Sequence, residues 1–304
     1  MTTRASLDFD DAEIARLDEA ARQIRISVIE AVNFAKAGHL GGPLSAADIL
    51  TALYFKVLRI RPEDPTWEDR DRFVLSKGHS AIGLYSTMAH RGYLPVSELL
   101  TFDAIHSRLQ GHPEMTRLPG IDMSTGSLGM GVSAAMGMAL GARVQGKDFI
   151  SVAMVGDGEC QEGQVWECAM SAARHSLDNF IVIVDENRLQ QFGWLTDRSD
   201  TGFRNVEAPH SPGQLADKWR AFGWRVLEMD GHDMRDILRT LAQALEKDDE
   251  HRPTCIVANT VKGKGVSYME NDYTWHGKQL SPQEYATALA DLGVGTDTAG
   301  QVSR

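Results

Sequence analysis

The chain has 304 residues, 42% of them hydrophobic and 24% charged, which is the composition of a globular protein large enough for one sizeable domain. Its formal net charge of −11 argues against nucleic acid or a membrane surface as the main partner, since both are polyanions. Cys160, Cys168 and Cys255 have no metal-binding spacing, and the sequence shows no signal-like N-terminus and no run of about twenty apolar residues. We therefore expect a protein of the reducing cytoplasm.

The N-terminal part of the chain is predicted to be helical. Apolar residues recur at helical spacing from residue 11 to residue 37, and a glycine follows. The next segment, AGHLGGPLSAAD, carries His39 and is expected to begin a new helix near Ser45, with Asp48 in a capping-box-like position. We expect residues 11–58 to form a helical N-terminal segment.

Strand and helix patterns alternate through the rest of the chain. Short apolar runs that end in turn residues predict strands at 72–75, 150–155, 180–184, 224–229 and 254–259. Helical spacing predicts helices at 81–91, 132–140, 161–175 and 233–247. This alternation predicts an α/β fold in which helices cover both faces of a doubly wound, mostly parallel sheet. We expect one domain over residues 1–304, with a loop at 198–213 and a flexible tail at 292–304.

The stretch from residue 149 to residue 193 is predicted to be one complete β–α–β unit. Asp157 and Gly158 follow its first strand, and Asn187 follows its second. A right-handed crossover places both strand ends at the same edge of the sheet, so Asp157 and Asn187 can meet there. Carboxylate and amide oxygens suit Mg²⁺ or Ca²⁺, and Gly158 lets phosphate oxygens approach the backbone. Ordinary turn chemistry is the alternative explanation for these residues.

The sequence GDGE, followed at this distance by an asparagine, resembles the thiamine-diphosphate motif. The surrounding sequence resembles the transketolase family, in particular the form of the enzyme that is made by two different subunits. The resemblance implies that Asp157, Asn187 and the backbone carbonyl of Leu189 bind Mg²⁺ or Ca²⁺. The family's usual Asn-Asn pair is Glu186-Asn187 in this chain.

Four histidines, each beside a glycine, lie in predicted loops: His39, His79, His112 and His276. Taken singly, each is more often a surface or packing residue. Their segments AGHLGG, SKGHS, GHPE and WHG resemble transketolase segments that line the channel to the reactive carbon. The resemblance implies that His39 and His276 contact substrate, that His79 and His276 contact the cofactor, and that His112 contacts the hydroxyl end of the donor sugar.

A glycine-rich loop, TGSLG, comes before the helix predicted at 132–140. By resemblance, its backbone and Leu128 pack on the two rings of the cofactor, although the family commonly has proline at position 127 and glutamine at position 130. Glu162 matches a family glutamate at the subunit boundary, where it is expected to link paired active sites. The full expected cofactor-binding set is His79, Gly126, Ser127, Leu128, Asp157, Gly158, Glu162, Asn187 and His276.

Three other motifs favour simpler interpretations. The sequence KGKG, which begins at Lys262, lacks the spacing of a Walker A phosphate loop, so an NTPase is excluded. The resemblance implies instead a flexible loop that leads to His276. Cys160 has no histidine base beside it in the sequence and is expected to be a packing thiol. We interpret His232 as a loop residue before a helix that Asp233 caps.

The resemblance extends from about residue 12 to residue 280 and covers the diphosphate-binding half of a transketolase. It implies a partner subunit with the pyrimidine-binding domain, whose glutamate triggers the cofactor, in a heterotetramer that transfers a two-carbon ketol unit from a ketose phosphate to an aldose phosphate. The alternatives are the α subunit of a 2-oxo acid dehydrogenase, a relative of deoxyxylulose-phosphate synthase, or a non-catalytic cofactor-binding module. The four glycine-adjacent histidines favour a sugar substrate.

Overall fold

A parallel sheet organises the chain in this computed structural model, which describes residues 7–191, 214–247 and 249–295. Its five strands follow the order β1-β2-β3-β5-β4, and every neighbouring pair is parallel. The strands are β1 (Arg72–Leu75), β2 (Ser151–Gly156), β3 (Phe180–Glu186), β4 (Arg225–Asp230) and β5 (Thr254–Asn259). The α-helices are α1 (Asp11–Ala35), α2 (Gly41–Ala52), α3 (Ala81–Arg91), α4 (Met130–Val144), α5 (Gly163–Arg174), α6 (Gln214–Ala221), α7 (Met234–Leu245) and α8 (Pro282–Asp291). The short helical segments are η1 (Leu53–Val57), η2 (Gly78–Ser80), η3 (Val96–Thr101), η4 (Glu159–Gln161) and η5 (Tyr273–His276).

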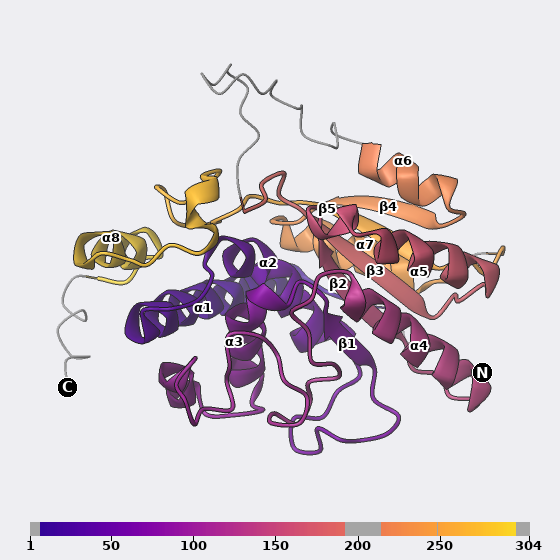
Figure 1. Cartoon of the computed structure of the whole chain (residues 1–304), viewed down its shortest axis with the longest axis horizontal. Helices are drawn as coiled ribbons and strands as arrows, with labels where there is room; N and C mark the ends of the chain where they lie inside the picture. The colour runs from indigo at the N-terminus through magenta and orange to yellow at the C-terminus, as the bar shows by residue number, and fades with distance from the viewer. Residues whose placement is uncertain (1–6, 192–213, 248, 296–304) are drawn as a thin grey trace.

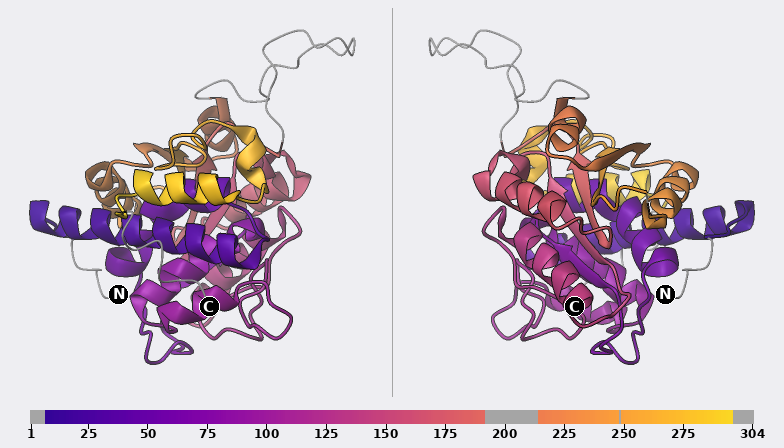
Figure 2. Two further views of the ribbon diagram at one scale, coloured as in Figure 1. Left: turned by 90° about the vertical axis from the view of Figure 1, so that its left-hand side faces the viewer. Right: turned by 90° about the vertical axis from the view of Figure 1, so that its right-hand side faces the viewer.

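Helices cover both faces of the sheet, as the sequence pattern predicts (Figures 1 and 2). Successive side chains of a strand point to opposite faces, so each strand supplies two separate cores. In β2, Val152 and Met154 pack in the core that α1, α2, α3, α7 and α8 share, whereas Ala153 and Val155 pack in the core of α4, α5 and α6. The strands are therefore apolar on both sides, which is typical of a parallel sheet.

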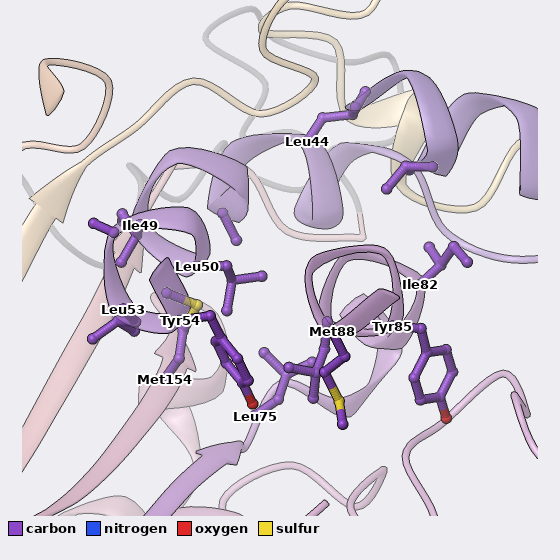
Figure 3. Close-up of a cluster of buried hydrophobic side chains, with 14 of the residues drawn as sticks. Leu44, Ile49, Leu50, Leu53, Tyr54, Leu75, Ile82, Tyr85, Met88 and Met154 are labelled. Carbon is purple, nitrogen blue, oxygen red and sulfur yellow. The ribbon is translucent and has the colours of Figure 1, made fainter. Parts of the chain in front are cut away.

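The N-terminal helices form a tightly packed layer with β1 and β2. Figure 3 shows how Leu50 and Tyr54, from α2 and η1, lie with Leu75, Met88 and Met154 in one cluster. Every residue of α2 is buried, which explains why its sequence shows no polar face. None of the helices in the described ranges combines the length and the apolar character that a membrane-spanning helix needs.

The start of α2 differs from the prediction. The helix begins at Gly41, so Ser45 and Asp48 lie inside it and form no capping box. Both side chains bind partners far away in the sequence instead. The hydroxyl of Ser45 donates to Asp185 at 2.6 Å, and Asp48 accepts from both terminal nitrogens of Arg25, at 2.8 and 2.5 Å.

The predicted elements agree with the structure to within a few residues. The strands at 72–75 and 254–259 and the helix at 81–91 have the predicted bounds, and α1 ends at a left-handed Lys36. The prediction of a flexible tail that begins at residue 292 is wrong for Leu292. This residue is buried, and its carbonyl accepts a hydrogen bond from Arg22 at 2.6 Å. The rest of that tail, 296–304, and the loop at 198–213 lie outside the described residues.

Candidate active site

Four loops bring the predicted histidines together at the carboxyl edge of the sheet. His39 follows α1, His79 lies in η2 directly after β1, His112 belongs to the loop before α4, and His276 ends η5. The ring centroids of His39, His79 and His276 lie 5.0 to 5.3 Å apart, and that of His112 is 6.4 Å from His39. The cluster therefore unites residues from 39 to 276 of the chain.

Burial favours the neutral form of three histidines of this cluster, His39, His79 and His276. Burial, and then the charge of Lys77, lower the pKa of His79 to about 2. Burial, and then the charge of Lys262, lower the pKa of His276 to about 3, and burial also lowers the pKa of His39. A neutral imidazole has one donor and one acceptor nitrogen, so these rings can both donate and accept hydrogen bonds at neutral pH.

The depressed pKa of His79 predicts a loss of stability in acid. An unfolded histidine titrates near pH 6.5 and takes up a proton there, whereas folded His79 stays neutral down to about pH 2. The contribution of His79 to the free energy of unfolding is therefore fully present above pH 6.5 and is lost as the pH falls below it. The free energy of unfolding, measured in urea between pH 8 and pH 5.5, should therefore fall less steeply with pH in His79→Gln than in wild type. Near pH 5.5 the two slopes should differ by about 1 kcal/mol per pH unit.

The control for this experiment is His175→Gln, which replaces an exposed histidine at the end of α5. Its unfolding free energy should follow the wild-type pH dependence. Equal slopes for wild type and His79→Gln would contradict the neutral state of His79.

On the other side of the site, Asp157 and Asn187 follow the ends of β2 and β3. The two strands are in register up to Gly156 and Asp185, so both residues leave the sheet side by side. The carboxylate of Asp157 accepts from the backbone N–H groups of Gly158 at 2.7 Å and Arg188 at 2.5 Å. Burial, and then the charge of Asp185, raise the pKa of Asp157 to about 7.

This arrangement is suited to a hard cation. Burial and the charge of Asp185 outweigh the backbone hydrogen bonds and the Lys262 charge that favour the Asp157 carboxylate, and a divalent ion beside it would add positive charge. The side-chain oxygen of Asn187 accepts from Leu189 N at 3.1 Å and keeps a second lone pair. Among the residues that the structure describes, no group of three or more His, Cys, Asp or Glu residues could hold a metal ion. The expected ligand set differs from such a group because it has one carboxylate, one amide and one backbone carbonyl.

Asp185 is a buried residue of the site that the sequence interpretation does not include. Its carboxylate accepts from Lys77 Nζ, from Thr260 Oγ1 and from Ser45 Oγ at 2.6 Å. Burial alone would raise the pKa of Asp185, but the Lys77 ammonium and these hydrogen bonds hold it below its ordinary value. The amide nitrogen of Asn187 also lies 3.3 Å from Asp185, which orients the amide and leaves its oxygen free to face Leu189.

Lys262 is the second residue that the sequence interpretation misses. The KGKG segment is expected to be a flexible loop, yet Lys262 is buried, and its amine donates to the carbonyls of Leu189 at 3.1 Å and Gln190 at 2.8 Å. The amine is also 2.9 Å from His276 Nδ1. Burial lowers the pKa of Lys262 to about 8. Gly41 makes room for its stem, since a Cβ there would lie 2.7 Å from Lys262 Cγ. The signal in the sequence that points to Lys262 is its position, three residues after the end of a predicted strand.

The glycine-rich loop packs against the turn that carries His79. A Cβ on Gly78 would lie 2.7 Å from Thr125 Oγ1, and one on Gly126 would lie 3.2 Å from the ring of His112. After Ser127, Leu128 is 36% exposed, and its neighbour Gly129 donates its N–H to the buried carboxylate of Glu159 at 2.9 Å. This loop therefore lies next to two of the four histidines.

The remaining predicted residues occupy different environments. Glu162 is exposed and lies beside the same loop, because a Cβ on Gly129 would be 2.9 Å from Glu162 Cβ. Cys160 is buried, and burial raises the pKa of its thiol, as a packing residue requires. Asp233 caps α7 as predicted, but His232 is more than a loop residue, since its ring bonds both Asp48 and the backbone of Val261.

The chain is similar to known proteins in both sequence and structure. The family described as "Transketolase, thiamine diphosphate binding domain" matches residues 17–303. The 6-deoxy-6-sulfo-D-fructose transketolase subunit SqwG of Clostridium sp. (strain MSTE9) is 40% identical over 91% of this chain and 96% of its own length. One of the subunits of apulose-4-phosphate transketolase from Phocaeicola vulgatus is 38% identical over 92% of this chain and 95% of its own length.

Longer proteins match over only part of their length. Human transketolase is 38% identical over 89% of this chain, which corresponds to 41% of the human protein. The crystal structure of transketolase from Campylobacter jejuni aligns with a TM-score of 0.81 and 34% identity, over 92% of this chain and 43% of that one.

Proposed function

The chain belongs to the transketolase family, and from this membership we propose that it is the diphosphate-binding subunit of a transketolase made of two different chains. The observation that carries the proposal is the extent of the matches. Two relatives named as transketolase subunits align over 96% and 95% of their length, whereas the human enzyme aligns over 41%. We further propose that residues 1–304 form one domain, which the single sheet of the described residues supports.

Thiamine diphosphate is the proposed cofactor, and when bound it supplies the chemistry that breaks a carbon–carbon bond of a ketose. The residues proposed to bind it are His79, Gly126, Ser127, Leu128, Asp157, Gly158, Glu162, Asn187 and His276, to which the geometry adds Lys262. The ammonium group of Lys262 matches the charge of a diphosphate. Gly158 leaves room for the side chain of Gln190, because a Cβ there would lie 3.0 Å from Gln190 Cγ.

We propose Mg²⁺ or Ca²⁺ as the metal, held by Asp157, Asn187 and the carbonyl of Leu189. Their oxygen atoms are hard ligands, and the raised pKa of Asp157 supports a cation beside it. The amine of Lys262 contacts the Leu189 carbonyl at 3.1 Å. That contact puts a positive group where the metal and the diphosphate are proposed to meet.

The histidine cluster is proposed to bind the sugar. His39 and His276 can form hydrogen bonds with a hydroxyl group of the substrate, and His112, at the outer side of the cluster, can bind the hydroxyl end of the donor. The contact of Lys262 with His276 Nδ1 supports a fixed orientation for that ring. Sugar hydroxyls need several short-range donors and acceptors, which four clustered imidazoles provide.

A partner subunit is proposed to cover this site. Exposed apolar side chains occur on the segments that carry it, at Met115, Leu128, Met130 and Tyr273. Covering them removes apolar surface from water and also excludes water from the reacting groups. The exposed Met170 of α5 and Val144 of α4 support a second contact, between two copies of the pair, and hence the proposed heterotetramer.

The decisive experiment measures two-carbon transfer with and without the partner. The chain is copurified from its native cell with the protein that binds it, and a panel of ketose donors is assayed that includes 6-deoxy-6-sulfofructose and apulose 4-phosphate, which appear in the names of its relatives. We expect the pair to be at least about a hundredfold more active than the chain alone, because the partner supplies an acid–base group. Full activity of the chain alone would contradict the two-subunit proposal.

A further inference from the structure

His232 connects two parts of the molecule that lie far apart in the sequence. It belongs to the turn between β4 and α7, and its side chain is only 11% exposed. Ring atom Nδ1 lies 2.8 Å from Asp48 Oδ2, and Nε2 accepts from the backbone N–H of Val261 at 2.8 Å. Because a backbone N–H can only donate, Nε2 carries no proton, and Nδ1 donates its proton to Asp48.

The Asp48 end of this connection is rigid. Arg25 of α1 binds both carboxylate oxygens of Asp48 with its two terminal nitrogens, at 2.8 and 2.5 Å, and its Nε donates to Leu44 O at 3.3 Å. Such a two-point contact fixes both the position and the plane of the carboxylate. Asp48 thus holds the imidazole of His232 against the packed layer of α1 and α2.

The other end of the connection reaches the proposed cofactor site. Val261 directly precedes Lys262, whose amine contacts His276 and the carbonyls of Leu189 and Gln190. The turn of His232 also packs against this segment, since a Cβ on Gly231 would lie 2.4 Å from Thr260 Cγ2.

We propose that His232 is a positioning residue that fixes the backbone at Val261. It thereby positions the amine of Lys262 next to His276 and to the bound diphosphate. His232 itself touches neither group. The proposal rests on the proposed function for what Lys262 binds, whereas the effect of His232 on the backbone stands without it.

Two substitutions of similar size test the hydrogen bonds of the two ring nitrogens separately. In His232→Asn the amide group lies near the position of Nδ1 and can still form a hydrogen bond with Asp48. No atom of the shorter side chain then accepts the hydrogen bond of the Val261 backbone N–H. In His232→Gln the amide oxygen reaches the place of Nε2 and can accept from Val261. With thiamine diphosphate and saturating Mg²⁺, measured on the chain with its partner, Kd should rise about tenfold in His232→Asn and less than about threefold in His232→Gln.

A second measurement needs neither cofactor nor partner. Amide hydrogen exchange at Val261 and Lys262 of the chain alone should accelerate in His232→Asn and stay close to wild type in His232→Gln. The matched control is His90→Asn, which removes a histidine of α3 that lies 2.9 Å from Ser27 Oγ, away from the Lys262 segment. It should change neither cofactor affinity nor exchange at these two amides.

Each outcome decides a different point. Wild-type exchange at Val261 in His232→Asn, or equal effects of the Asn and Gln variants on exchange and affinity, would overturn the positioning role. Failure of the wild-type pair to bind thiamine diphosphate would overturn the proposed function, and the exchange comparison would still decide the role of His232.

Discussion

Asp157→Asn is expected to lower the affinity for thiamine diphosphate at fixed Mg²⁺ by at least about a hundredfold. Even residues that only support a metal ligand change affinity by about 10- to 100-fold, and Asp157 is the one carboxylate of the proposed ligand set. The same substitution should not destabilise the chain in cofactor-free buffer, because burial and Asp185 already disfavour the charge of Asp157 there. Calorimetric titration and thermal unfolding of the same preparations measure both effects.

The control variant is Asp148→Asn, which removes a carboxylate just before β2, at the opposite end of that strand. Asp148 pairs with Arg59 at 2.9 and 3.2 Å and is partly exposed. We expect unchanged cofactor affinity in this variant. An Asp157→Asn protein that binds cofactor and Mg²⁺ like wild type would refute the metal site, whereas one that fails to fold would refute the view that this charge is unfavourable without a cation.

The features that the sequence predicts well are those set by local pattern. The strand at 72–75 and the helix at 81–91 are delimited by residues within each segment, so their bounds agree with the structure. The parallel pairing of β2 and β3 follows from the right-handed crossover between them. This pairing places Asp157 beside the end of β3. The four histidines are identified by resemblance, and their ring contacts arise where four separate loops converge.

The features that the sequence does not predict depend on partners that are distant along the chain. Ser45 and Asp48 have the spacing of a capping box, but Ser45 binds Asp185, 140 residues away, and Asp48 binds Arg25. Lys262 lies in a segment that is polar and rich in glycine, as a mobile loop is. It is ordered because its amine donates hydrogen bonds to the carbonyls of Leu189 and Gln190, which lie near it only in the folded chain.

The buried pair of Lys77 and Asp185 is expected to have the largest effect on stability. Lys77 is 2% exposed and Asp185 is fully buried, and Ser45 and Thr260 complete the hydrogen bonds of the carboxylate. Asp185→Leu should reduce the free energy of unfolding by about 3–5 kcal/mol, because it leaves the Lys77 ammonium buried without a counter-charge. Urea unfolding at pH 7.5 measures this loss. Asp217→Leu, which breaks an exposed pair with Arg220, should cost less than about 1 kcal/mol.

The double variant Lys77→Met, Asp185→Leu distinguishes stability from function at this pair. Replacing both partners removes the unpaired charge, so most of the lost stability should return. Cofactor binding should not return, because Asp185 also orients the amide of Asn187, and that contact stays absent. A double variant as unstable as Asp185→Leu would mean that the loss came from packing rather than from charge. One that is stable and binds thiamine diphosphate with Mg²⁺ like wild type would show that neither Asp185 nor Lys77 supports the site.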